Sequence, residues 1–248
     1  MSKQPLKGVR IAIVGGGPGG LLLARLLQLN SAATVTVYER RRRHKVVQPN
    51  HCRGRLTLLL SNSVKPGTVE WNKHFLNLSQ ESDSSYKISF EDGTFTMADV
   101  LVGSDGGRSK VSPFVTSIKP YYMGFHILEA VMKKAKEIIN WFEADFPDYS
   151  DFWLELWEKA DLPVVLRPQY ITPTDKPWDH PPILTLIGDA AHVVPPYGAT
   201  GVNGALHDAY MLAKFLVDQD HYKTPQGAIE GYEEYMRKQM ATNVKTVY

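Results

Sequence analysis

A run of glycine residues near the start of this chain of 248 residues constrains its fold more than any other feature. The run is Gly15-Gly16-Gly17-Pro18-Gly19-Gly20. It follows residues 9–14, which are apolar and rich in β-branched side chains and therefore predict a buried parallel strand. Residues 21–27 predict a helix, and residues 34–38 predict a second strand. Together these segments predict a β-α-β unit and an α/β fold.

Within the run, Gly15, Gly17 and Gly20 have the spacing G-x-G-x-x-G. In a strand–turn–helix context the first glycine permits the tight turn, the second lets the backbone approach a pyrophosphate, and the third lets the helix pack on the strand. The N-terminus of the helix presents free N–H groups to the phosphates. Glu39 follows the second strand, where an acid accepts hydrogen bonds from the adenosine ribose and disfavours a 2′-phosphate. This motif predicts FAD or NAD rather than NADP.

A second motif lies near the other end of the chain. Gly188 and Asp189 directly follow residues 183–187, which predict a buried strand, and an Asp at this place can accept a hydrogen bond from a ribityl hydroxyl of FAD. Asn203 is a candidate N-cap for a helix over residues 205–217, whose dipole would stabilise negative charge on a reduced flavin ring. The two motifs together predict FAD, with its pyrophosphate on the first motif and its flavin end on the second.

The remaining apolar and turn-forming patterns predict further elements. They are a strand at 54–59, a loop at 61–67, a hairpin at 86–96, a strand at 99–103, a long helix at 127–142, irregular chain at 163–182, and closing helices at 203–217 and 228–241. We expect His192, which follows Asp189 by three residues, to be a packed or hydrogen-bonded histidine rather than a catalytic base.

Composition excludes several classes of protein. The formal net charge of +2 is too small to indicate a nucleic-acid partner or an anionic membrane surface. The sequence has no apolar run of the roughly 20 residues that span a bilayer, and residues 1–5 lack the apolar core of a signal peptide. Cys52 is the single cysteine, and its spacing from His44 and His51 matches no standard zinc pattern. We therefore expect a cytoplasmic enzyme without a metal site.

These residues give the chain a resemblance to a known family. It resembles the class A flavoprotein monooxygenases, which have the fold of para-hydroxybenzoate hydroxylase, and is most similar to the tetracycline-inactivating FAD monooxygenases and their fungal relatives. Three motifs carry the resemblance: residues 15–20 with Glu39-Arg40, residues 103–111 (GSDGGRSKV), and residues 186–203. In the family, the second of these motifs touches both FAD and the nicotinamide cofactor. The resemblance implies a Rossmann-like, FAD-binding, three-layer α/β core.

The resemblance also implies a reaction. NADPH would reduce the bound FAD, the reduced flavin would take O2 to a C4a-hydroperoxide, and that species would hydroxylate an aromatic or polycyclic small molecule. The motifs that carry the resemblance do not identify a catalytic side chain. The cofactor-binding residues that it implies, together with those predicted above, are Gly15, Gly17, Pro18, Gly19, Gly20, Glu39, Arg40, Arg55, Asp105, Asp189, Pro196, Gly201, Val202 and Asn203.

The chain also departs from the family, because it is markedly shorter. One stretch is missing after Leu60, where the family has a helix whose Arg contacts FAD, and Thr57 stands where the family often has an Asp near the flavin. Another is missing between about Tyr121 and Ala130, where the family builds most of its substrate-binding sheet. We therefore expect a reduced or partly missing substrate-binding sheet.

The expected division of the chain follows from these departures. Residues 1–120 would form the first FAD-binding part, residues 121–180 a remnant of the substrate domain with a linker, and residues 181–248 the C-terminal FAD-binding part.

An alternative function stays open: an FAD-binding remnant that does not hydroxylate, acting as a binding or regulatory module or as an uncoupled NADPH oxidase. An exposed flavin would favour the oxidase, because water would divert the activated oxygen to H2O2. The sequence does not identify the substrate or the oligomeric state.

Overall fold

The computed structural model describes residues 6–43, 52–82, 85–129, 165–173, 176, 178, 181–196 and 200–247. The chain divides into two compact units, one formed by Met1–Pro120 with Ile171–Tyr248 and the other by Tyr121–Tyr170. The first unit contains both glycine motifs. Within the described residues no helix combines the length and the apolar character needed to cross a membrane.

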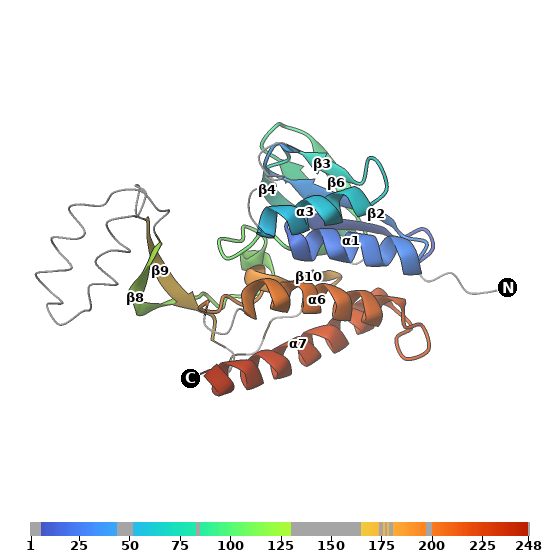
Figure 1. Cartoon of the computed structure of the whole chain (residues 1–248). Helices are drawn as coiled ribbons and strands as arrows, with labels where there is room; N and C mark the ends of the chain where they lie inside the picture. The colour runs from blue at the N-terminus through green and yellow to red at the C-terminus, as the bar shows by residue number, and fades with distance from the viewer. Residues whose placement is uncertain are drawn as a thin grey trace, which may run out of the picture. The chain divides into compact units, whose positions relative to one another are not determined.

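A parallel sheet of five strands forms the middle of the first unit (Figure 1). Its spatial order is β10 (Leu184–Leu186), β7 (Val100–Gly103), β1 (Arg10–Val14), β2 (Thr34–Glu39) and β3 (Val69–Trp71). All four pairings are parallel. The central strands β1 and β7 are buried along nearly their whole length, as expected for strands that are covered on both faces. The predicted β-α-β unit and the Rossmann-like α/β fold are confirmed.

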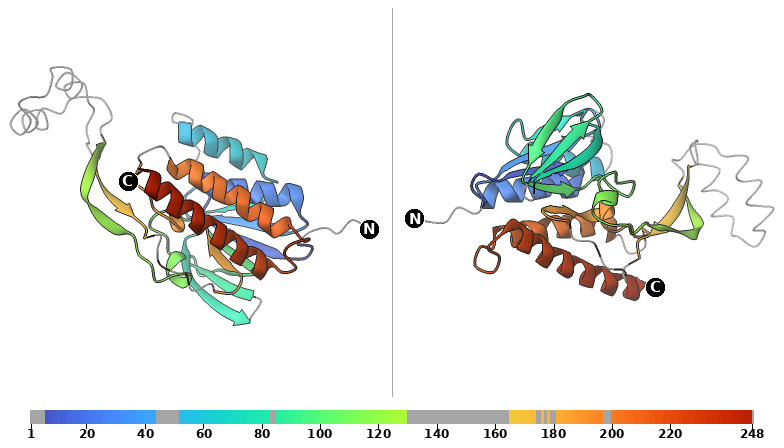
Figure 2. Two further views of the ribbon diagram at one scale, coloured as in Figure 1. Left: turned by 90° about the horizontal axis from the view of Figure 1, so that it is seen from below. Right: turned by 180° about the vertical axis from the view of Figure 1, so that it is seen from behind.

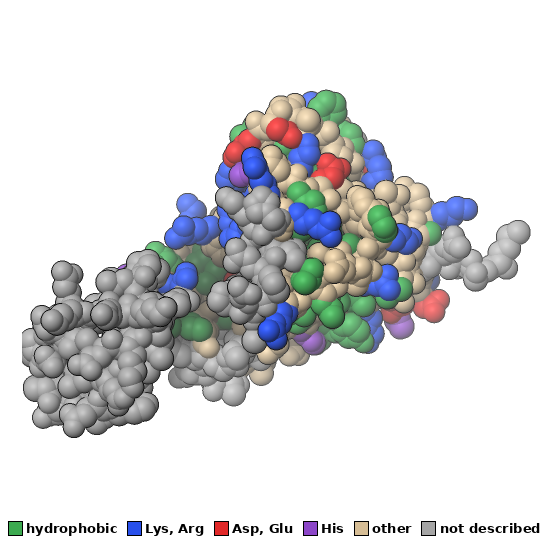
Figure 3. All heavy atoms as spheres, turned by 45° about the horizontal axis from the view of Figure 1, so that its top comes forward, with side chains coloured by type: hydrophobic (Ala, Val, Ile, Leu, Met, Phe, Trp, Pro, Cys, Tyr) green, Lys and Arg blue, Asp and Glu red, His purple; other side chains and the backbone are tan. Residues whose placement is uncertain are grey.

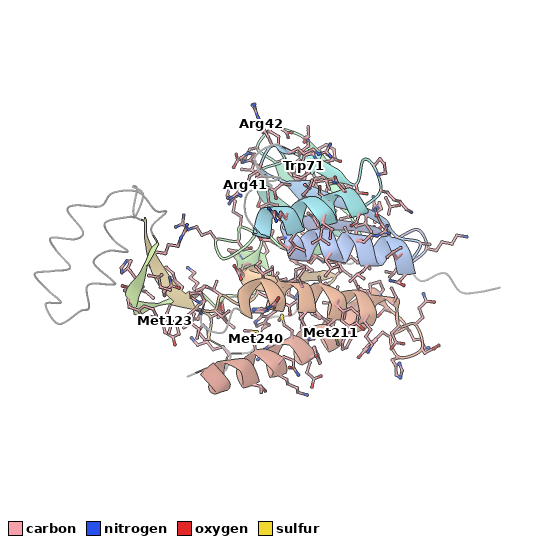
Figure 4. All side chains as sticks on the ribbon, viewed as in Figure 1. Arg41, Arg42, Trp71, Met123, Met211 and Met240 are labelled. Atoms are coloured by element: carbon pink, nitrogen blue, oxygen red, sulfur yellow. The ribbon has the colours of Figure 1, made fainter. Side chains whose placement is uncertain are left out.

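Helices cover one face of this sheet and a second sheet covers the other (Figure 2). The helices are α1 (Pro18–Asn30), α3 (Cys52–Ser63), α6 (Thr200–Val217) and α7 (Pro225–Val247). Helix α1 packs on α3 and α6, and α6 packs on α7. Figure 4 shows Met211 of α6 and Met240 of α7 in the space between their two helices. These layers form the predicted three-layer core.

The second sheet of this unit is antiparallel and consists of β4 (Phe75–Ser82), β5 (Ser85–Phe90) and β6 (Phe95–Ala98). The predicted hairpin is confirmed, because β5 and β6 pair across the turn that contains Gly93, whose φ is +81°. The Tyr38 hydroxyl donates a hydrogen bond of 3.2 Å to Oγ1 of Thr96, and the Tyr38 ring lies 4.8 Å from that of Phe90. These contacts join β2 to the antiparallel layer.

The strand predicted at residues 54–59 is wrong, because α3 occupies this segment. The buried positions Thr57 and Leu60 of α3 are three residues apart, and the next buried residue, Val64, follows the end of the helix four residues later, whereas Leu59 is 66% exposed. That spacing is the period of a helix with one packed face and not the alternation of a strand. Helix α3 therefore lies next to the point after Leu60 where the sequence suggested that a helix of the family is missing. Its last turn includes the first residues of the loop predicted at 61–67.

The second unit contains a two-stranded sheet of β8 (Tyr121–Glu129) and β9 (Val165–Ile171). The helix predicted at 127–142 is wrong over its first residues, which belong to β8, and the rest lies outside the described residues. Exposure alternates along residues 122–127, as it does in a strand with one covered face. The irregular chain predicted at 163–182 is likewise corrected, because β9 occupies part of it.

Candidate functional site

The carboxyl ends of β1, β2 and β7 meet at a cavity of about 690 Å³. Ligands of open parallel sheets bind at this edge, because there the loops and the helix N-termini face the same crevice. The cavity is lined by Val14, Gly15, Gly16, Gly17, Pro18, Tyr38, Glu39, Arg40, Arg41, Gly54, Thr57, Lys73, His74, Phe75, Ser104, Asp105, Gly106, Gly107, Arg108, Lys110 and Asp189. Parts of all three sequence motifs therefore meet in one cavity.

The glycines of the first motif differ in their surroundings. Gly15 has a φ of +114°, and a Cβ on it would overlap the carbonyl oxygen of Ser104. A Cβ on Gly20 would overlap the carbonyl oxygen of Gly15, and one on Gly19 would lie 3.0 Å from the carbonyl oxygen of Ala205 in α6. Gly15 and Gly20 are therefore required by close packing of the backbone, and at Gly19 a side chain would have little space.

Gly17 is different, because a Cβ built on it would have no atom within 4 Å. It is the N-cap of α1, with φ −73° and ψ 176°, and no side chain caps the helix there. Pro18 follows at the first helical position. Both residues line the cavity, so the N-terminus of α1 faces it with room for a ligand.

Glu39 holds the end of β2 against the glycine turn. Its side chain is buried, and its Oε2 accepts a 2.7 Å hydrogen bond from the backbone N–H of Gly16. Its Oε1 accepts a 2.8 Å hydrogen bond from the backbone N–H of Arg41. Each carboxylate oxygen can accept a further bond, so Glu39 can fix the turn and still bind a hydroxyl in the cavity.

Arg40 and Arg41 follow Glu39, and both are exposed and line the cavity. Figure 4 shows Arg41 and Arg42 extending outward from the end of β2, close to Trp71 of β3. The position of β3 explains two cavity residues that the sequence did not predict, Lys73 and His74. Because β3 pairs in parallel with β2, the residues that follow it reach the same edge of the sheet.

Asp105 closes the loop that follows β7. Its Oδ1 accepts a 2.6 Å hydrogen bond from the Ser109 hydroxyl, and its Oδ2 accepts a 2.7 Å hydrogen bond from the backbone N–H of Lys110. Asp105 thus shapes a loop whose residues Arg108 and Lys110 also line the cavity. Nζ of Lys110 forms an ion pair of 2.9 Å with Glu91.

The charge of the cavity wall favours an anion. Five Lys or Arg side chains line it, against three carboxylates. Basic side chains are spread over the face of the first unit shown in Figure 3. Lys73 is held by Asp92, with Nζ 2.7 Å from Oδ2, which fixes one of these cations in place. Arginine and lysine beside a helix N-terminus form a typical site for a phosphate or diphosphate.

Asp189 is the residue of the second motif that reaches the cavity. It is exposed and lies in the 3₁₀ turn η2 (Gly188–Ala190), directly after β10. A Cβ built on Gly201, in the first turn of α6, would lie 3.9 Å from Oδ1 of Asp189. The start of α6 is therefore next to Asp189. Asn203 is not the N-cap of this helix, because α6 begins at Thr200.

The other predicted binding residues lie outside the cavity wall. Arg55 is exposed on α3, whereas its neighbours Gly54 and Thr57 line the cavity. Pro196 is exposed in the loop before α6, and Val202 and Asn203 lie in the first turns of that helix. Gly19 and Gly20 lie in α1 with the packing roles described above. His44 and His51 lie outside the described residues.

His192 is buried and hydrogen-bonded, as predicted. Its Nε2 lies 2.6 Å from Oδ2 of Asp208 in α6, and both side chains are more than nine-tenths buried. Burial lowers the pKa of His192, but the charge and hydrogen bond of Asp208 outweigh it, so the pKa is raised. Nearby, burial and the charges of Asp208 and Glu233 raise the pKa of Tyr232 well above its ordinary value.

Sequence comparisons agree with this geometry. Residues 176–246 match the family described as FAD binding domain, and residues 13–44 match the NAD(P)-binding Rossmann-like domain. A dual O-methyltransferase/FAD-dependent monooxygenase from Cercospora beticola is 37% identical over 67 residues. The match spans 27% of this chain and only 8% of the length of that curated relative.

Solved structures share the fold at low sequence identity. A protein described as an FAD containing monooxygenase from Photorhabdus luminescens has a TM-score of 0.81 and 19% identity, with 94% of each chain covered. A tetracycline destructase has a TM-score of 0.67 and 16% identity, with 96% of this chain and 88% of that chain covered. A salicylate hydroxylase has a TM-score of 0.72 and 16% identity, with 99% of this chain and 88% of that chain covered. The predicted resemblance to the FAD monooxygenases is therefore confirmed.

Proposed function

We propose that this chain binds FAD and is an FAD-dependent oxidoreductase, a monooxygenase that uses NADPH and O2 to hydroxylate an aromatic or polycyclic small molecule. One observation carries the proposal: the glycine turn after β1, Glu39 at the end of β2, Asp105 after β7 and Asp189 after β10 line the same cavity. A ligand that touches all four is long, and its anionic part lies at the N-terminus of α1. The match of residues 176–246 to the FAD binding domain supports FAD.

The residues of the cavity fit FAD in three respects. Gly17 leaves open space at the N-terminus of α1, where a pyrophosphate would be bound by backbone N–H groups. Glu39 keeps acceptor capacity for the adenosine ribose, and Asp189 is exposed to accept from a ribityl hydroxyl. Arg40 and Arg108 add positive charge at the rim of the cavity.

FAD, when bound, would accept a hydride from NADPH and activate O2 for insertion into the substrate. The chain itself binds and orients the cofactor, and the start of α6 beside Asp189 presents its positive dipole end to the flavin end of the site. We propose an aromatic substrate because several proteins of the same fold are named for small aromatic compounds or were solved with one bound. These include 2,6-dihydroxypyridine-3-hydroxylase from Arthrobacter nicotinovorans, salicylate hydroxylase, and a Klebsiella pneumoniae protein complexed with FAD and uric acid.

The alternative is FAD binding without hydroxylation, and the second unit is the reason to retain it. Within the described residues this unit has only the two strands β8 and β9. The shorter sequence predicts a reduced substrate-binding sheet, and a reduced sheet would leave the flavin more open to water, which would release H2O2 in place of a hydroxylated product. A cytoplasmic location is part of the proposal, and the choice between NADPH and NADH as reductant stays open.

An absorption spectrum of the purified protein, followed by NADPH addition under air with a panel of aromatic compounds, tests the proposal. A yellow protein whose NADPH consumption rises with one compound, with matching hydroxylated product by mass spectrometry, supports the monooxygenase. NADPH consumption that yields only H2O2 supports the uncoupled oxidase. A protein that takes up FAD but is not reduced by NADPH or NADH supports the binding module, and one that takes up no FAD contradicts all three.

Replacing Asp189 with alanine is expected to weaken FAD binding by about 10-fold to about 100-fold, the cost of one lost hydrogen bond to a charged group. The fold should remain, because the Asp189 side chain is exposed. Titration of the apoprotein with FAD, followed by flavin fluorescence, measures the affinity. Glu234→Ala removes another exposed carboxylate on α7 and should leave the affinity unchanged. Equal affinities in wild type and Asp189→Ala would remove this residue from the site.

A further inference from the structure

A cluster of buried polar side chains lies behind the turn that carries Asp189. Its members are at most 6% exposed and come from β10, the residues after η2, α6 and α7. They are Thr185, His192, Asp208, Tyr232 and Glu233. None of them lines the cavity, and the proposed reaction uses none of them directly.

Asp208 holds both ends of this turn. Its Oδ2 accepts a 2.8 Å hydrogen bond from the backbone N–H of Gly188, the residue before Asp189. The same Oδ2 lies 2.6 Å from Nε2 of His192, which is three residues after Asp189. Within the turn, the N–H of His192 donates a 2.9 Å hydrogen bond to the carbonyl of Gly188. One carboxylate on α6 thus fixes the segment from which Asp189 faces the cavity.

Nε2 of His192 is held by Asp208. Among the described residues, the buried Nδ1 of His192 has no hydrogen-bond partner. The charge of Asp208 compensates best when His192 is protonated, because a buried carboxylate is costly without a counter-charge.

We propose that His192 and Asp208 are positioning residues for Asp189, and that the pair holds the 188–192 turn in its FAD-binding form most firmly while His192 carries a proton. The inference rests on the proposed function, because Asp189 is assigned to FAD there. It predicts that FAD binding depends on pH through a residue that the cofactor does not touch.

The direction of this dependence follows from the groups around His192. Asp208 faces His192 from α6 and Asp189 acts on it from η2. The charges of Asp208 and Glu233 both act on Tyr232 of α7. The pKa of His192 is raised from 6.5. The stabilisation of the 188–192 turn by the pair is therefore complete below about pH 6.5, and it is lost as the pH rises through the raised pKa. FAD affinity should therefore fall as the solution becomes alkaline.

The experiment measures FAD affinity by flavin fluorescence and the melting temperature of the apoprotein from about pH 6 to about pH 9. In wild type, affinity should fall by about 10-fold or more over this range, whereas in His192→Gln it should be low and independent of pH. Asp208→Asn preserves the shape of the side chain and should behave like His192→Gln. His207→Gln changes an exposed histidine of the same helix, bonded to Tyr235, and should match wild type.

The double variant His192→Gln/Asp189→Ala separates positioning from a purely structural role. If the pair acts through Asp189, the double variant should bind FAD no more weakly than Asp189→Ala alone. Additive losses, or variants with lower melting temperatures but wild-type affinity and pH dependence, would overturn the inference. Wild-type protein that binds no FAD would overturn the proposed function, whereas wild-type binding with unaffected His192→Gln and Asp208→Asn would overturn the pair alone.

Discussion

Gly17→Val is expected to abolish FAD binding while leaving the fold intact. A Cβ at this position meets no atom within 4 Å, and the residue lines the cavity, so the valine side chain would enter the space that the pyrophosphate needs. The backbone, at φ −73° and ψ 176°, is extended and suits valine. We expect a loss in affinity of at least about 100-fold, equivalent to about 2.7 kcal/mol.

Fluorescence titration with FAD measures this loss, and circular dichroism during heating measures the fold. Valine is a poorer N-cap than glycine, which should lower the stability of α1 by no more than about 1 kcal/mol. Gly17→Ala adds a single methyl group and should give an intermediate affinity. Wild-type affinity in Gly17→Val, with the fold retained, would show that the cofactor phosphates are not bound at the N-terminus of α1.

The sequence predicted the elements whose signals are local. The strand–glycine–helix unit at residues 9–27 combines a β-branched run, a turn and a leucine-rich helix within one short segment, so its elements can be predicted without knowledge of the distant strands that pair with it. Helix α3 was missed because a short leucine-rich run suits either a strand or a helix. Its packing on α1, with Thr57 and Leu60 buried, decides between them.

The candidate site was predicted only where a motif marks the end of a strand. Glu39 ends β2, Asp105 and Asp189 follow β7 and β10, and all three line the cavity. Lys73 and His74 follow a strand of three residues whose parallel pairing with β2 is not apparent from its sequence. The hydrogen bond between His192 and Asp208 likewise depends on how α6 packs against η2.

Gly15→Ala is expected to destabilise the fold strongly, by at least about 3 kcal/mol of unfolding free energy. The new Cβ would overlap the carbonyl oxygen of Ser104 at the place where three strand ends are bonded together. There the N–H of Gly15 donates a 2.9 Å hydrogen bond to Tyr38, and the N–H of Ser104 donates a 2.7 Å hydrogen bond to Val14. Relieving the overlap therefore breaks hydrogen bonds that align β1 with β2 and β7.

Gly8→Ala is the matched control for this substitution. Gly8 has a φ of +82°, also in the left-handed region, but a Cβ on it would meet no atom within 4 Å. Alanine at Gly8 should therefore cost only the backbone strain, about 1 kcal/mol, whereas alanine at Gly15 adds the clash. Urea unfolding of the two variants measures the difference. Equal stabilities would mean that the ends of β1 and β7 can separate without loss, and the close approach of Gly15 to Ser104 would then not stabilise the sheet.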